Sequence, residues 1–124
     1  MANQTEKMVL IGTHGAEDPV RATLPFVVAN AALAMDVKAV VILQGLPSVQ
    51  IAMKGANEHI FTTGFPPLKE LMDSFFAQGG ELLVCTPCMT AQKFTSEMLV
   101  EGAVMVAGAR VVQECLEAKA VLNY

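Results

Sequence analysis

The chain of 124 residues has the length of one ordinary domain, and we predict a single domain over residues 1–124. Hydrophobic residues make up 53% and charged residues 16% of the chain, which excludes intrinsic disorder. The net charge of −4, eight scattered basic residues and an aromatic content of 6% argue against nucleic-acid binding. The apolar runs are too short to span a bilayer, and the polar segment 1–7 has no signal-peptide core, so we expect no membrane partner.

Short apolar runs alternate with helical patterns along the chain. The apolar runs predict buried strands at 8–12, 37–43, 81–85, 103–106 and 119–123. Helical spacing and end signals predict helices at 18–35, 68–78 and 108–118, a short helix at 48–53 and another within 86–99. Strands that alternate with helices imply parallel pairing and right-handed crossovers. The sequence therefore predicts a three-layer α/β/α sandwich with about five mainly parallel strands, covered on both faces.

Two features of the helices are specific enough to be tested. Pro25 lies inside the first helix, where it removes a backbone hydrogen bond, so we expect a kink or a late start there. In the last helix the apolar spacing predicts an inner face formed by Val112, Cys115 and Leu116.

Ligands of such sheets bind beyond the carboxyl ends of the parallel strands, and three connections leave those ends with useful residues. They are Thr13-His14-Gly15, the segment 45–55, and Cys85-Thr86-Pro87-Cys88. We expect these connections to share one edge, where His14, Gly15 and Lys54 line a small pocket with Cys85. Lys54 is the nearest candidate for a cation that favours a thiolate, and a solvated surface lysine explains it equally well.

The Cys-Thr-Pro-Cys segment carries the strongest chemical signal. Cys85 ends a strand just before a helix, so backbone amides and the helix dipole favour a thiolate, the nucleophile of sulfur exchange. Cys88, one turn further on, is explained equally by packing and by an accessory role. Cys115 is expected to pack on an apolar helix face. Three cysteines do not form a secreted disulfide framework, so we expect a reducing, cytoplasmic location.

Other chemistries that use Cys-x-x-Cys fit the sequence less well. A thioredoxin fold places the pair after its first strand and a cis-proline downstream, whereas here the pair follows the third strand and no proline follows Pro87. A zinc site lacks a second Cys-x-x-Cys or a His pair, so no metal is predicted. The dinucleotide fingerprint and the phosphate loop are also missing, so no cofactor is expected.

Several segments together resemble one known family over about residues 7–124. They read MVLIGTHG, ANAALAMD before VKAVVIL, PPLKELMDSFFAQGGELLVCTPCM, and VEGAVMVAGARVVQECLEAKAVL. In these segments the chain resembles the DsrE/DsrF-like family of sulfur-relay proteins. The resemblance implies an α/β/α sandwich, dimers or hexamers, and a cysteine near the third strand that carries persulfide sulfur. Cys85 matches that position, while His14-Gly15 stands where the family often has an aromatic residue and a glycine.

We therefore predict a small sulfur-transfer protein, a candidate sulfurtransferase, that carries sulfane sulfur as a persulfide on Cys85 between a donor and an acceptor protein. Two alternatives stay open: a thiol-redox protein that uses Cys85 and Cys88 as a reversible disulfide, and a non-catalytic oligomeric binding subunit. The low charge and the many methionines and alanines predict a homo-oligomer, a trimer or a hexamer.

Overall fold

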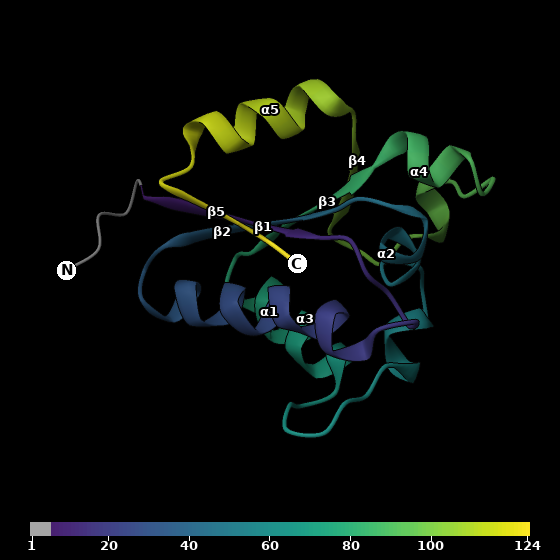
Figure 1. Cartoon of the computed structure of the whole chain (residues 1–124), viewed down its shortest axis with the longest axis horizontal. Helices are drawn as coiled ribbons and strands as arrows, with labels where there is room; N and C mark the ends of the chain where they lie inside the picture. The colour runs from purple at the N-terminus through teal and green to yellow at the C-terminus, as the bar shows by residue number, and fades with distance from the viewer. Residues whose placement is uncertain (1–5) are drawn as a thin grey trace.

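A parallel sheet runs through the middle of the molecule (Figure 1). The computed structural model describes residues 6–124. The strands lie in the order β4-β3-β2-β1-β5, and every neighbouring pair is parallel. Their bounds are β1 (Lys7–Gly12), β2 (Lys38–Leu43), β3 (Glu81–Cys85), β4 (Ala103–Val106) and β5 (Ala120–Asn123). The predicted five-stranded α/β/α architecture is thus confirmed.

Two helices cover one face of the sheet. These are α1 (Pro19–Ala34) and α3 (Leu68–Ala77), which lie together below the strands in Figure 1. The rings of Phe26 and Phe75 meet edge to face between them, with centroids 5.4 Å apart, and both side chains are fully buried. The larger of the two hydrophobic cores lies between these helices and the sheet.

The first helix begins where the sequence predicts it. Asp18 caps it, because its side chain accepts the backbone N–H of Arg21, and Pro19 occupies the first turn. The helix continues through Pro25, so the late start that we considered is wrong. Pro25 is itself buried, and its packing helps to offset the hydrogen bond that it cannot make.

The opposite face carries one helix, α5 (Gly108–Glu117), drawn above the sheet in Figure 1. Val111, Cys115 and Ala118 pack against the second, smaller core on this face. Because a single helix covers this face within residues 6–124, apolar side chains at the two sheet edges stay exposed. Val104 of β4 and Val121 of β5 are 50% and 42% exposed.

The predicted inner face of α5 is correct for Cys115 and wrong for Val112 and Leu116. These two side chains point outward and are 58% and 82% exposed. Glu114 takes the inner position instead and is only 4% exposed. A buried carboxylate is tolerated there because Lys7 contacts it from the first residue of β1.

Short helical segments follow the carboxyl ends of the inner strands. They are α2 (Leu46–Gln50) and η1 (Ala56–His59) after β2, and α4 (Thr86–Thr90) and η2 (Ser96–Met98) after β3. The first therefore lies slightly earlier than the predicted 48–53, and α4 begins directly after β3. None of the helices in the described part of the chain is long and apolar enough to cross a membrane.

Candidate thiol site

The connections that follow β1, β2 and β3 meet at the carboxyl edge of the sheet, as the topology predicts. Gly15 lies so close to the next connection that a Cβ atom built on it would be 2.1 Å from the Pro47 carbonyl oxygen. The backbone N–H of Gly45 donates a hydrogen bond to the Cys88 sulfur, with a nitrogen–sulfur distance of 3.3 Å. Each connection therefore touches its neighbour directly.

Gly45 determines how the middle connection turns toward the cysteines. Just before it, the N–H of Gln44 extends the hydrogen bonding between β1 and β2 by donating to the Gly12 carbonyl at 3.0 Å. Gly45 then adopts φ 93° and ψ 151°, a conformation that is open essentially to glycine alone. The turn leaves its N–H directed at the third connection, where Cys88 lies.

The two cysteines of the third connection lie one helical turn apart. Cys85 is the last residue of β3, and Cys88 lies in the first turn of α4. Both are half-buried, unbridged, and packed against the core on the α1 and α3 side of the sheet. The Cys88 side chain lies close enough to Cys85 to raise the pKa of its thiol. The site therefore presents two neighbouring thiols at a sheet edge.

The surroundings of Cys85 favour its neutral form. Burial raises the pKa of the Cys85 thiol, and the hydrogen bond to the side chain of Cys88 raises it further. The backbone N–H of Cys88 acts in the opposite direction and less strongly. The helix after Cys85 is only five residues long, so its dipole is small. The thiolate predicted from the strand-end position is thus disfavoured at Cys85 itself.

Gln92 ties the second and third connections together. Its side-chain amide donates to the carbonyl of Cys88 at 2.9 Å and to that of Leu46 at 3.1 Å, and its oxygen accepts from Gln50. Sequence reasoning missed both Gln92 and Gly45. Gly45 stood inside a connection that we had singled out, but the sequence carries no signal for Gln92.

His14 and Gly15 are held by an acidic neighbour. The Nδ1 atom of His14 lies 2.7 Å from Oε2 of Glu17, and the backbone N–H of Gly15 donates to the other carboxylate oxygen. The Gly15 bond first, and the His14 contact second, lower the pKa of Glu17. Glu17 is thus the hydrogen-bonding partner of the His14 ring, and a pocket shared by His14 and Cys85 stays a prediction.

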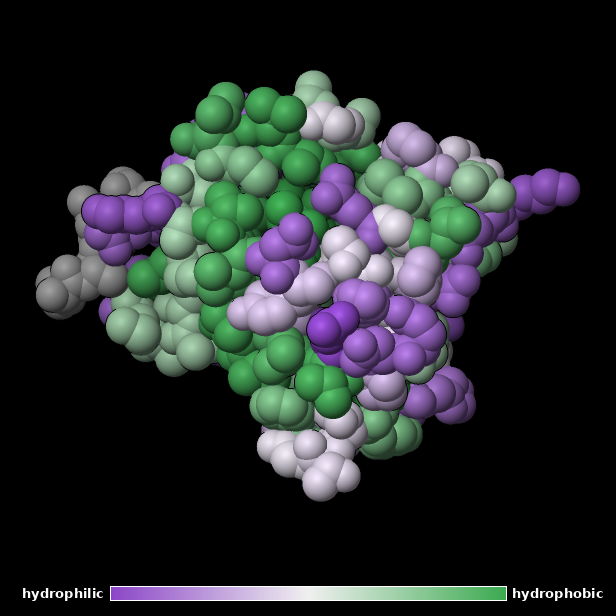
Figure 2. Space-filling model, in the orientation of Figure 1, coloured by the Kyte–Doolittle hydropathy of each residue, from purple (hydrophilic) through white to green (hydrophobic). Residues whose placement is uncertain are grey.

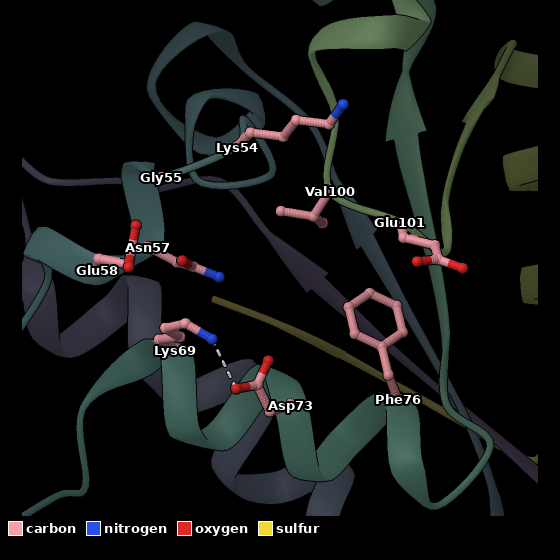
Figure 3. A pocket seen from close by; sticks show the side chains of 9 residues that line it. All are labelled: Lys54, Gly55, Asn57, Glu58, Lys69, Asp73, Phe76, Val100 and Glu101. Atoms are coloured by element: carbon pink, nitrogen blue, oxygen red, sulfur yellow. Dashed lines mark hydrogen bonds and ion pairs between the residues drawn. The ribbon is translucent and has the colours of Figure 1, made fainter.

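Lys54 lies at a separate hollow of about 320 Å³, seen from close by in Figure 3. Phe76 and Val100 form part of its wall, and the ion pair of Lys69 and Asp73, 2.8 Å apart, lies across from Lys54. The residues that line this hollow include neither cysteine and not His14. Lys54 is exposed, as the reading of a solvated surface lysine requires. Its role as the cation beside a thiolate stays a prediction.

Over residues 6–124, no three or more His, Cys, Asp or Glu side chains are grouped so that they could hold a metal ion. The chemistry that the arrangement supports is that of the two thiols. A sulfur atom beside a second thiol and a backbone N–H can attack a disulfide or a persulfide, and the second thiol can then attack the product.

Comparison with known proteins supports both the fold and the family. The model of the DsrE/DsrF-like family matches residues 6–124. The ychN protein from E. coli superposes with a TM-score of 0.74 at 14% identity, covering 96% of this chain and 99% of that one. MTH1491 from Methanobacterium thermoautotrophicum, a protein of unknown function, gives 0.71 at 14% identity with the same coverage. BT1422 from Bacteroides thetaiotaomicron, also of unknown function, gives 0.66 at 13% identity, covering 100% and 99% of the two chains. No curated protein matches the chain.

Proposed function

The chain belongs to the DsrE/DsrF-like family, and we propose that it is a sulfur carrier that holds sulfane sulfur as a persulfide on Cys85. The family supports a role of the sulfur-relay type. The observation that carries the proposal is the pair of free, half-buried cysteines in contact at the carboxyl edge of the sheet. Sulfur transfer needs a sulfur that can act as a nucleophile and partial shielding from water, and two half-buried thiols at one sheet edge support such a role.

In this function a donor protein or a small persulfide delivers sulfur to the pair, and the thiol of an acceptor protein removes it. We place the reaction in the cytoplasm, because free cysteines persist in a reducing compartment. The contact between Cys85 and Cys88 also favours a second candidate function, a thiol-redox protein in which the two form a reversible disulfide.

Intact-mass measurement after incubation with glutathione persulfide tests the proposal. The wild-type protein should gain about 32 Da, the mass of one sulfur atom, and the gain should disappear on reduction. The double variant Cys85→Ser/Cys88→Ser should gain nothing, whereas Cys115→Ser, the matched control on α5, should behave as wild type. A loss of about 2 Da would favour the redox function instead, and no change at all would contradict both.

We further propose that the protein assembles with copies of itself through the side of the sheet that carries α5, which we call the α5 face. Figure 2 shows hydrophobic residues gathered over α5 and continuing toward β5. Leu116 and Val112 project outward from the helix, and Val121 is exposed at the sheet edge beside it. A surface of this kind is typical of subunit interfaces. A second copy is the occupant we favour, because the predicted trimer or hexamer needs such a surface.

Light scattering tests the assembly. The wild-type protein should have the mass of a trimer or a hexamer, and Leu116→Ser should weaken association by roughly 10- to 100-fold, since burial of a leucine is worth about 1.5–3 kcal/mol. Met35→Ser is the matched control, because Met35 is 68% exposed on another surface. A wild-type protein that stays monomeric at micromolar concentration would rule the assembly out.

A further inference from the structure

The two sulfur atoms of the site are held in unequal surroundings. The Cys88 sulfur accepts the backbone N–H of Gly45 at 3.3 Å, and a backbone N–H can only donate. Such a bond is stronger when the acceptor carries a negative charge. Cys85 has a raised pKa, first through burial and then through its hydrogen bond with the Cys88 side chain. The structure thus directs the Gly45 N–H at the Cys88 sulfur, whereas at Cys85 burial raises the pKa by more than the Cys88 backbone N–H lowers it.

Besides its packing against the core, Cys88 has three polar neighbours among the described residues. These are the amide of Gly45, the thiol of Cys85, and Gln92, whose side chain donates to the Cys88 carbonyl. All three are uncharged at neutral pH. The interaction on which the proposal draws is therefore the hydrogen bond from the Gly45 N–H to the Cys88 sulfur.

We propose that Cys88 takes sulfane sulfur from the persulfide donor and then passes it to Cys85. This order of events rests on the function proposed above. Cys85 remains the holding site that the sequence predicts, whereas Cys88, for which the sequence suggests an accessory role or packing, becomes the entry nucleophile.

The first step is attack by the Cys88 thiolate on the outer sulfur of a persulfide, R–S–SH. A sulfur–sulfur bond forms between Cys88 and that atom, the bond inside the donor breaks, and R–S⁻ leaves with the electron pair. The products are a Cys88 persulfide and the donor thiolate, so no external oxidant or reductant is needed. The Gly45 N–H stabilises the attacking thiolate before the step.

In the second step Cys85 releases its proton to solvent, and its sulfur attacks the outer sulfur of the Cys88 persulfide. The bond to Cys88 breaks, Cys88 leaves as a thiolate, and a Cys85 persulfide remains. Exchange is faster when the leaving thiolate is better stabilised. Cys88 leaves toward the Gly45 amide, whereas the reverse step must expel Cys85, whose thiolate burial disfavours. The sulfur therefore comes to rest on Cys85.

Single-cysteine variants test the order. In a Cys115→Ser background, Cys85→Ser retains Cys88 alone and Cys88→Ser retains Cys85 alone. With glutathione persulfide, Cys85→Ser should gain about 32 Da at the rate of the parent protein, and Cys88→Ser should be at least about threefold slower. The threefold figure corresponds to a difference of about one pKa unit between two thiols. Such a difference changes the thiolate fraction about tenfold, and the lower intrinsic nucleophilicity of the more acidic thiol offsets about half of this on a logarithmic scale.

The outcomes separate the two proposals. Equal rates, or faster loading of Cys88→Ser, would overturn the order while leaving the carrier function intact. If the parent protein gains no sulfur at all, the proposed function fails, and the order fails with it.

Gly45→Ala tests the role of the backbone N–H, because alanine is strained at φ 93° and should displace the amide from the Cys88 sulfur. Gly64→Ala is the matched control: Gly64 has the same φ of 93°, and an added Cβ would meet nothing within 4 Å. In the protein that retains Cys88 alone, Gly45→Ala should slow sulfur loading from glutathione persulfide at one fixed pH, and Gly64→Ala should not. Identical loading rates in a folded Gly45→Ala protein would contradict the proposal. If that variant does not fold, the comparison of loading rates decides alone.

Discussion

The buried carboxylate on α5 offers a quantitative test of how this helix is held to the sheet. Lys7 lies 2.9 Å from both Glu114 and Glu117, and the Nε atom of Arg110 lies 2.7 Å from Glu114. The side chains of Lys7 and Glu114 are only 16% and 6% exposed. Substitution Lys7→Met keeps the length of the aliphatic chain but removes the charge. Glu114 then stays buried, and of the two cations named here only Arg110 still contacts it.

Removal of one partner from a fully buried ion pair costs about 3–5 kcal/mol. Arg110 still neutralises part of the charge, so we expect Lys7→Met to lower the free energy of unfolding by about 2 kcal/mol, within the range of one hydrogen bond to a charged group. The double variant Lys7→Met/Glu114→Leu should recover most of this loss, because no buried charge is then left unpaired.

Urea unfolding at pH 7 and one fixed protein concentration measures these differences. Lys69→Met is the matched control. It breaks an ion pair with Asp73 of the same 2.8–2.9 Å length, but both side chains are about half exposed, so it should cost no more than about 0.5 kcal/mol. If Lys7→Met costs as little as this control, or if the double variant is no more stable than Lys7→Met, the network does not hold α5 as we argue.

Two further predictions concern pH and close packing. Burial raises the pKa of Glu114, but the hydrogen bonds from its cationic partners lower it by more, to below the ordinary 4.5. The stability that Glu114 contributes is therefore complete above about pH 4.5 and is lost as the pH falls through the lowered pKa of the folded state. The free energy of unfolding of Glu114→Leu should consequently fall less steeply with decreasing pH than that of wild type. Gly15→Ala should destabilise the protein by about 1–3 kcal/mol in urea, because its Cβ would overlap the Pro47 carbonyl, whereas Gly108→Ala has open space and should not destabilise it. A stable Gly15→Ala protein would mean that the first two connections do not meet at this point.

The strands were predictable because each is a continuous apolar run, as a parallel sheet with both faces occupied requires. The outward turn of α5 was not predictable. Val112 and Leu116 have the spacing of an inner face, and the ion pair that draws Glu114 inward comes from Lys7, more than a hundred positions away. Apolar spacing cannot show a partner so distant in sequence.

The meeting of the three connections followed from topology alone, since the carboxyl ends of parallel strands share an edge. The distribution of roles between the cysteines did not. That distribution depends on the direction of the Gly45 N–H, which is set by the positive φ of 93° at this residue. The residue types alone do not reveal this direction. Lys54 illustrates the same limit. Its position after the second strand is compatible with a place beside the thiols and equally with the separate hollow that it lines in the structure.

The thiol site and the α5 face use different sides of the sheet, and this separation has a consequence for function. Cys85 and Cys88 pack against the core under α1 and α3, whereas Leu116 projects from the helix on the opposite side. Assembly through the α5 face should therefore leave the thiols open to a donor. Leu116→Ser should change the mass in solution while leaving the rate of sulfur loading unchanged, and Cys88→Ser should do the reverse. Loading that slows in Leu116→Ser in proportion to the loss of assembly would place the thiols at the subunit interface and refute the separation.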